Sequence, residues 1–515
     1  MRGLLAAAAV LLLAVGLPAQ TRVTHVRTQI GVEAERLDLA LADVDGDGRL
    51  DLLLPRYDRE LGLRLLDIHL LRPNGAYPQE PDLRHELKSG IVGWGVGEFD
   101  PETPGRELLF LARDAAYVFD PRDEGYAGNL RRLVRAPMLL DVSGLRALPR
   151  WEAIADVDGD GVDEVALATA DGLLLVSGTG RVMGGASLRP VPGQAPAGER
   201  RFKLMAFELT AQTLAGLLVP DEDHAALDPP PILFAEESQP LPFLADADGD
   251  GLRDLAWFAG GALHVLRARR DSSGAVSLEP EPGLSLRLEK EGGEEAYDLE
   301  SVQLVEAGGG PAADLLVVRS QGSNPLSEEW QILLYHDAFA EGAALGQPAG
   351  IAVLESSRAD PWILDVDGDG RRDLAVTSWS TDLVQLGLQG VRIRHSVFLY
   401  PATEEGRFRR RPRILSERSF DVEEFEAFAL IPPLEADLSG DGRVDLLESD
   451  AKGTVEVRPL VGRGSEIRFG DPSLRVELDA AEAFLQVQDL NGDGIGDFVV
   501  THLLSDVVET WVSLP

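Results

Sequence analysis

The stretch Asp365-Val366-Asp367-Gly368-Asp369-Gly370-Arg371-Arg372-Asp373 decides how this sequence is organised, because the same nine-residue pattern, with small variations, occurs six times. Carboxylates stand at positions 1, 3, 5 and 9, and glycines stand at positions 4 and 6. The glycines allow a tight turn, so that several hard oxygen atoms can be directed at one point. Ca²⁺ requires about 6–8 such oxygens. The pattern therefore predicts a calcium-binding loop.

Six copies of the loop are complete and are expected to hold about six Ca²⁺ ions. Ser439 and Asn491 replace the carboxylate at position 3 in the last two copies, and both keep an oxygen atom there. The residue at position 7 of each loop is included in the expected site. The expected metal-site residues are Asp43, Asp45, Asp47, Arg49, Asp51, Asp156, Asp158, Asp160, Val162, Glu164, Asp246, Asp248, Asp250, Leu252, Asp254, Asp365, Asp367, Asp369, Arg371, Asp373, Asp437, Ser439, Asp441, Arg443, Asp445, Asp489, Asn491, Asp493, Ile495 and Asp497.

Two of the intervals between complete loops are about twice the shortest one, and each contains a degenerate copy. The copy from Glu98 to Leu108 keeps acids at a spacing of two but has one extra residue before its last acid, so weak metal binding is expected. The copy from Glu306 to Leu315 lacks carboxylates at positions 3 and 5 and is expected to be metal-free. With both included, loops start at residues 43, 98, 156, 246, 306, 365, 437 and 489 and define eight units.

Each unit has the sequence signals of about four antiparallel strands. In the first unit, residues 37–41 alternate before the loop, residues 52–54 follow it as an apolar run, and residues 63–71 form a third strand-like run before Asn74-Gly75. An Asn-Gly pair favours a hairpin turn. After the last loop only residues 498–515 remain, which suffice for two strands. Thr21 to Ile30 is therefore predicted to supply a missing strand and to close a ring without exposed sheet edges.

The first residues have the features of a secretory signal. Met1-Arg2-Gly3 precedes an apolar run from Leu4 to Leu17, and Pro18-Ala19-Gln20 follows it. The alternative is an uncleaved membrane anchor, but the run is shorter than the ~20 residues that a spanning helix needs. We expect a signal peptide at residues 1–19, no transmembrane segment after its cleavage, and export to a secreted, periplasmic or cell-surface location. Residues 20–515 would then form the repeat domain, with an insertion near residues 199–240.

The composition restricts the partners of the protein. The chain of 515 residues has 87 acids and 48 bases, which gives a formal net charge of −39. Such a charge argues against binding to nucleic acid and disfavours an anionic membrane, because both are negatively charged. Cysteine is absent. An exported protein without disulfides needs another means of stabilisation, which calcium can provide.

The pattern D-x-D-G-D-G-x-x-D-L, between two strands and repeated at roughly sixty residues, resembles the FG-GAP/VCBS repeats of integrin-α-like β-propellers. The resemblance extends over essentially residues 20–515. It implies an all-β fold, a β-propeller of four-stranded antiparallel blades with calcium in the loop that joins the first two strands of each blade. It also implies, more loosely, adhesion or ligand binding on a rim. Eight blades are expected here, and the seven of integrins are the alternative.

Other calcium motifs fit less well. An EF-hand needs a helix on each side of the loop and a Glu at position 12, whereas the flanking sequence here is rich in strand-forming residues. Dockerin-like loops should lie close together as a pair, and thrombospondin-type arrays would bring cysteines. The remaining alternative is a set of acidic turns without metal. At position 12, where an EF-hand needs Glu, only one of the six complete loops has it; the residues there are Leu54, Leu167, Trp257, Val376, Glu448 and Val500.

The sequence has no recognisable catalytic motif. It contains neither H-E-x-x-H nor G-x-S-x-G nor a cysteine nucleophile, and calcium accounts for nearly all of its strong acidic clusters. Trp379, in a polar segment, is the best candidate for an exposed aromatic that stacks on a sugar or contacts a partner. The basic run from Arg407 to Arg413 could bind an anionic sugar or an acidic protein, and the alternative is a solvated hairpin edge. We expect no enzyme, but a scaffold that binds an unknown extracellular protein or polysaccharide. The alternative is a calcium-dependent, lyase-like enzyme that acts on polysaccharides.

Overall fold

The computed structural model describes most of the chain in many short ranges. The signal segment 1–19 and Asp367 lie outside the described residues, as does nearly all of the predicted insertion at 199–240, so these predictions remain untested. The described residues are 23–32, 39–58, 60–126, 128–138, 148–188, 191–192, 237–238, 241–259, 261–288, 297–308, 310–322, 328–340, 348–366, 369–382, 392–404, 406–421, 428–430, 434, 436–450, 452–462, 466–478, 482–502 and 507–514.

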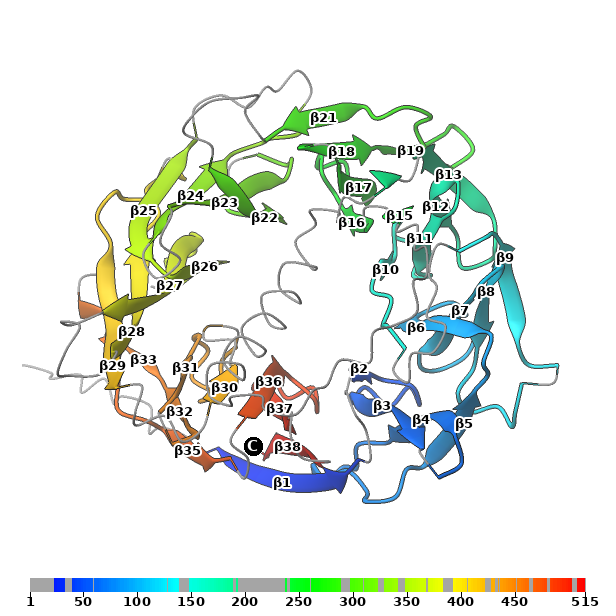
Figure 1. Ribbon diagram of the computed structural model, residues 1–515, viewed down its shortest axis with the longest axis horizontal. Helices are drawn as coiled ribbons and strands as arrows, with labels where there is room; N and C mark the ends of the chain where they lie inside the picture. Colours follow the sequence, from blue (N-terminus) through cyan, green and yellow to red (C-terminus); the bar gives the residue numbers. More distant parts are fainter. Residues whose placement is uncertain are drawn as a thin grey trace, which may run out of the picture.

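Eight β-sheets lie side by side in a ring and form an eight-bladed β-propeller (Figure 1). The expectation of an all-β fold with eight blades is confirmed. Blades 1 to 4 are formed by β2 (Ala40–Ala42), β3 (Asp51–Asp58), β4 (Leu63–His69) and β5 (Leu83–Leu87); β6 (Ile91–Gly97), β7 (Glu107–Ala112), β8 (Ala115–Phe119) and β9 (Arg131–Arg135); β10 (Ile154–Ala155), β11 (Glu164–Thr169), β12 (Gly172–Val176) and β13 (Val182–Ser187); and β16 (Phe243–Ala245), β17 (Asp254–Ala259), β18 (Ala262–Leu266) and β21 (Leu284–Arg287).

The second half of the ring has the same plan, with one irregular junction. The remaining blades are formed by β22 (Asp298–Val305), β23 (Asp314–Gln321), β24 (Glu328–Tyr335) and β25 (Gly350–Ser356); β26 (Arg358–Leu364), β27 (Asp373–Asp382), β28 (Arg392–Tyr400) and β29 (Arg413–Asp421); β31 (Leu446–Ser449), β32 (Thr454–Arg458) and β35 (Leu474–Glu477); and β36 (Glu482–Gln488), β37 (Asp497–His502), β38 (Val507–Leu514) and β1 (Thr24–Gly31). Three small hairpins are β14 (Val191–Pro192) with β15 (Glu237–Ser238), β19 (Ala268–Arg270) with β20 (Val276–Leu278), and β33 (Leu460–Val461) with β34 (Arg468–Phe469).

The irregular junction lies between blades 7 and 8. β30 (Phe428–Leu430) precedes the loop of blade 7, yet it pairs in parallel with β36 of blade 8. The described part of the blade 7 sheet consequently has three strands, and the blade 8 sheet has five. Blades 1 to 6 have the four antiparallel strands that the sequence predicts.

The N-terminal strand closes the ring as predicted. β1 pairs with β38 in antiparallel register, from Thr24 opposite Leu514 to Gly31 opposite Val507. β1 is the outermost strand of blade 8, whose other three antiparallel strands come from the C-terminal end of the described chain (Figure 1). The two ends of the repeat domain are therefore joined within one sheet.

The hydrophobic core lies between neighbouring blades rather than in one central place. The second strand of a blade is covered on both faces, which explains why Leu52, Leu53 and Leu54 are consecutive apolar residues and are each at most 1% exposed. One cluster joins Leu53 of blade 1 to Trp94 and Phe110 of blade 2. Each fully buried side chain of this size contributes roughly 1.5–3 kcal/mol. Packing of each sheet on the next thus holds the ring together.

Four of the tryptophans lie in the core. Trp94, Trp151, Trp257 and Trp330 are buried, as expected for side chains packed between sheets. Trp379 is half-buried and stacks on His395 at a ring distance of 4.3 Å.

Within the described ranges, the search for a helix of sufficient length and hydropathy to span a membrane finds none.

Candidate metal sites

The acidic loops occupy the same place in successive blades. Each complete loop ends at the first residues of a blade's second strand; for example, the loop from Asp43 leads from β2 to β3. Its glycines at positions 4 and 6, Gly46 and Gly48, have φ angles of 79° and 85°. Only glycine adopts this conformation without steric cost. The pattern of glycines therefore produces the turn that brings the carboxylates together.

The aspartate at position 1 organises the turn. In the first loop, the amide of Gly46 donates to Asp43 Oδ1 at 2.6 Å, and the amide of Gly48 donates to Asp43 Oδ2 at 2.8 Å. Both oxygens are thus held by backbone N–H groups that also offset the negative charge. The same two bonds from glycine amides form in the loops that begin at Asp156, Asp246, Asp437 and Asp489.

The acid at position 9 is buried and fastens the loop to the blade. Asp51 is 1% exposed; its Oδ2 accepts from the amide of Val44 at 2.9 Å, and its Oδ1 accepts from the amide of Leu71 at 3.0 Å. Burial raises the pKa of Asp51 to about 7, although these amides oppose the shift. Burial likewise raises the pKa of Glu164 to about 8. A nearby cation would stabilise the charged form of both carboxylates.

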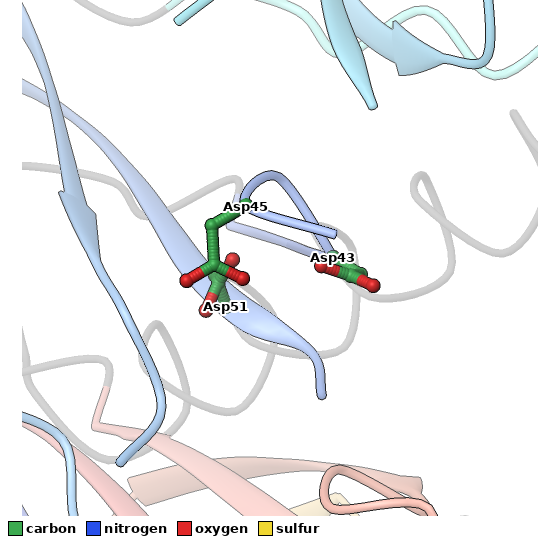
Figure 2. A group of neighbouring side chains, drawn as sticks. All are labelled: Asp43, Asp45 and Asp51. Atoms are coloured by element: carbon green, nitrogen blue, oxygen red, sulfur yellow. The ribbon is translucent and has the colours of Figure 1, made fainter. Parts of the chain in front are cut away.

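Four loops bring three carboxylates close enough to share one ion. In each, one oxygen from each of three acids lies within 4.8 Å of the others. Figure 2 shows the first such group, with Asp45 directed toward Asp51 and Asp43 at the start of the turn. The four groups are Asp43, Asp45 and Asp51; Asp156, Asp158 and Glu164; Asp246, Asp248 and Asp250; and Asp437, Asp441 and Asp445. Such hard oxygen donors fit Ca²⁺ and exclude soft-metal chemistry at these loops.

The remaining predicted ligands lie near these groups or support them. Ser439 places its hydroxyl 3.2 Å from Asp445 Oδ1 and 3.5 Å from Asp437 Oδ1, between the acids of positions 9 and 1. At position 5, Asp47, Asp160, Asp250, Asp369, Asp441 and Asp493 accept from the amides of position 7, namely Arg49, Val162, Leu252, Arg371, Arg443 and Ile495. The side chains of Arg49 and Arg371 also pair with the position 5 acids of their own loops, Asp47 and Asp369.

The loops that begin at Asp365 and Asp489 are less complete in the described structure. Asp365 accepts from the amide of Gly370 at 2.9 Å, and Asp373 is buried. Asn491 directs its side-chain nitrogen to Asp493 Oδ2 at 3.1 Å and to the carbonyl of Ser513 at 2.7 Å. Neither of these two loops, nor either degenerate loop, shows a comparable group of three acids among the residues described. Asp497 completes the set of position 9 acids and is fully buried.

In the degenerate loop of blade 5, a histidine contacts the acid at position 9, Asp314. His336 Nδ1 lies 3.1 Å from Asp314 Oδ1, and His336 Nε2 lies 2.8 Å from the carbonyl of Gly406 in blade 6. The hydrogen bond to Asp314 raises the pKa of His336. Because both ring nitrogens face acceptors, the imidazolium form fits this place. The sequence showed that the loop had lost carboxylates at positions 3 and 5, but it did not reveal that His336 contacts the retained acid Asp314.

A further feature missed by the sequence analysis is that the loops are hydrogen-bonded to one another. The residue just before position 9 donates its amide to a carbonyl at position 1 or 2 of the preceding loop. No local pattern predicts this contact, because it depends on how neighbouring blades pack. The bonds run from Leu50 to Leu490, Arg106 to Asp43, Asp163 to Glu98, Arg253 to Val157, Ala313 to Ala247 and Gly496 to Asp437, at 2.6–3.0 Å.

Comparison with known proteins gives only distant likenesses. No family model matches the chain, and no curated protein matches it. Among solved structures, BBS1N in complex with ARL6DN is 14% identical, with 70% of this chain and 95% of that chain covered and a TM-score of 0.25. Sqt1 from Chaetomium thermophilum is 12% identical, with 92% and 95% covered and a TM-score of 0.39. The S. cerevisiae core factor is 7% identical, with 96% and 62% covered and a TM-score of 0.28. Likenesses this remote say nothing about function.

Proposed function

We propose that this protein is an exported β-propeller of the FG-GAP/VCBS type that binds about six Ca²⁺ ions in its blade loops and serves as a non-enzymatic interaction scaffold. One observation carries the proposal. Four loops in four different blades each gather three carboxylates within 4.8 Å. A chance cluster of surface acids would not recur in the corresponding loop of four different blades.

The distribution of these loops supports a structural role for the metal. Catalytic ligands converge on one cleft, whereas these groups are spread around the ring, over blades 1, 3, 4 and 7. When bound, Ca²⁺ would neutralise clustered carboxylates such as Asp43, Asp45 and Asp51, whose mutual repulsion otherwise opposes the turn. The chain itself holds position 1 by glycine amides and position 9 by strand amides. The loop is therefore largely formed before the ion enters.

The partner follows from charge and location. With a net charge of −39, nucleic acid and anionic membranes are poor partners. A secretory signal at residues 1–19 supports an extracellular or periplasmic setting. We therefore infer an extracellular protein or polysaccharide as the ligand of the propeller surface.

Chelation tests the calcium part of the proposal. Each site should stabilise the folded protein by about 2.7 kcal/mol when free Ca²⁺ exceeds its dissociation constant a hundredfold. Removal of calcium with EDTA should consequently lower the melting temperature and increase protease cleavage near the loops, and Ca²⁺ should restore both better than Mg²⁺. Melting and proteolysis that stay unchanged in EDTA would contradict the proposal.

A polysaccharide array followed by product analysis tests the scaffold part. Binding without any change in the bound polysaccharide supports a scaffold. Calcium-dependent release of shortened, unsaturated products would instead favour the lyase-like alternative.

A further inference from the structure

The loop of blade 4 differs from that of blade 1 because one arginine bridges two of its acids, whereas Arg49 of blade 1 pairs with the position 5 acid Asp47. Arg269, at the centre of β19, places Nη1 3.0 Å from Asp248 Oδ2 and 2.8 Å from Asp250 Oδ2. Its Nε pairs with Glu279 Oε1 at 2.9 Å. One guanidinium nitrogen thus bridges the acids of positions 3 and 5, which are two of the three carboxylates grouped in this loop.

The acid at position 3 of the blade 4 loop, Asp248, has different partners from the position 3 acids of blades 1 and 3. In the first and third blades, Asp45 and Asp158 accept from the amides of position 5 at 3.2 Å, so they complete the turn of their own loop. Asp248 instead turns Oδ2 toward Arg269, and Arg267 Nε lies 3.4 Å from the same oxygen. Asp248 Oδ1 is buried and has no hydrogen-bond partner in the described structure. The arginines have therefore satisfied one oxygen of this carboxylate and left the other for a cation.

The β19–β20 hairpin is fixed in place at its base and on its far side. The amide of Ala268 donates to Asp254 Oδ1 at 2.8 Å, which ties the hairpin to position 9 of the same loop. Arg270 Nη2 donates to the carbonyl of Asp158 in the blade 3 loop at 2.6 Å, and Arg181 of blade 3 donates to the carbonyl of Val276 at 3.0 Å. The hairpin backbone is thus anchored to two blades. Of the two arginines beside Asp248, Arg269 is the more exposed, at 40% against 14% for Arg267, so its side chain is the one that can leave the acids.

We propose that Arg269 is a built-in cation of the blade 4 loop, which Ca²⁺ has to displace, so that this site fills last. The inference rests on the calcium binding proposed above. An ion coordinated by Asp248 and Asp250 cannot share those oxygens with a guanidinium at 2.8–3.0 Å without strong like-charge repulsion. Two partly exposed ion pairs must then be broken, which weakens apparent calcium affinity roughly 2- to 30-fold relative to an equivalent loop without the arginine.

Calcium titration of the full chain tests this proposal with a matched control. Arg269→Gln removes the cation from the acids, whereas Arg392→Gln removes a similarly exposed arginine that pairs with Asp421 in blade 6, at the end of the sheet away from the loop. In isothermal titration calorimetry, the unaltered protein and Arg392→Gln should both show a weak site beside the tight ones. In Arg269→Gln that weak site should tighten roughly 2- to 30-fold.

Melting experiments without calcium provide a second readout. In EDTA, Arg269→Gln should melt at a lower temperature than the unaltered protein, because Asp248 and Asp250 lose their counter-charge. In saturating Ca²⁺ the difference should disappear. Weaker calcium binding in Arg269→Gln, an equal gain of affinity in Arg392→Gln, or the absence of any weak site would overturn the proposal. If the unaltered protein binds no calcium at any loop, both this inference and the proposed function fail. If the other loops bind calcium normally but the affinity of the weak site does not change in Arg269→Gln, this inference fails and the proposed function stands.

Discussion

Replacing Arg27 with methionine should loosen the strand that closes the ring. Glu509 is fully buried, and Arg27 of β1 holds it with two hydrogen bonds, from Nη2 to Oε1 at 2.9 Å and from Nε to Oε2 at 3.0 Å. Gln29 of β1 and His502 of β37 add bonds to Oε1 at 3.1 and 3.0 Å. Two residues of the N-terminal strand therefore fasten it to a carboxylate in the C-terminal strand.

The size of the effect follows from the burial of Glu509. Removal of one partner of a buried ion pair costs about 3–5 kcal/mol, because the other charge is left uncompensated. The Arg27 side chain is 35% exposed, so we expect a smaller cost than for a fully buried pair, about 2–3 kcal/mol. Amides in β1 and β38 should then exchange with solvent roughly 30- to 150-fold faster if this strand opens locally.

Hydrogen exchange measured by mass spectrometry is the appropriate assay, because it resolves residues 24–31 and 507–514 from the rest of the ring. Arg122→Met is the matched control: Arg122 makes a similar two-bond pair with Asp120 in blade 2, at 2.9 and 2.8 Å, far from the closure. It should leave exchange in β1 unchanged. Unaltered exchange of β1 in Arg27→Met, or an equal increase in all blades, would refute the reasoning.

The same site predicts a pH dependence. Burial alone would raise the pKa of Glu509, but the hydrogen bonds from His502, Arg27 and Gln29 outweigh it and lower the pKa from 4.5 to about 2. A depressed pKa means that the contribution of Glu509 to stability is complete above pH 4.5 and is lost as the pH falls toward 2. The difference in unfolding free energy between the unaltered protein and Glu509→Gln should therefore be constant above pH 4.5 and shrink below it.

Three further predictions concern the loops. An alanine Cβ at Gly105 would clash with the carbonyl oxygen of Val44. Gly105→Ala should therefore destabilise the protein by roughly 1–3 kcal/mol more than Gly125→Ala, because Gly125 also has a positive φ but has nothing within 4 Å. Equal melting temperatures of the two variants would show that the loops of blades 1 and 2 do not pack tightly. The pKa of His336 is raised by its hydrogen bond to Asp314. The unfolding free energy that His336 adds relative to His336→Gln should therefore be complete below pH 6.5 and decline at higher pH. Thermal melts of both proteins at several pH values measure this difference. Asp45→Ala should lower the amount of bound calcium by about one ion. Glu306→Ala, in a degenerate loop, should not change that amount, and equal losses in both variants would remove the basis for assigning ligands by position.

The blade number was predictable from the sequence because the signal is local. Glycines such as Gly46 and Gly48 are needed wherever the turn has a positive φ, and the acids at positions 1 and 9 make the same bonds in each copy. The closing strand was predictable by counting, since the last unit lacked a strand that β1 supplies. Both inferences depend on pattern and length alone.

The contacts between blades were not predictable in the same way. Arg27 and Glu509 are 482 residues apart, and only the register of β1 on β38 brings them together. Likewise, the sequence around Arg269 resembles an ordinary strand, and its approach to Asp248 depends on how the β19–β20 hairpin folds back over the loop. The parallel pairing of β30 with β36 was missed because strand order at an irregular junction leaves no periodic signal.

Counting the calcium ions bound to the full-length protein tests the central claim most directly. Equilibrium dialysis against radioactive Ca²⁺, over a range of free concentrations, gives the number of sites and their relative affinities without assumptions about stability. We predict about six ions at saturation, with one of them bound more weakly than the others. One ion or none at millimolar free Ca²⁺ would contradict the assignment of these repeated acidic loops as metal sites.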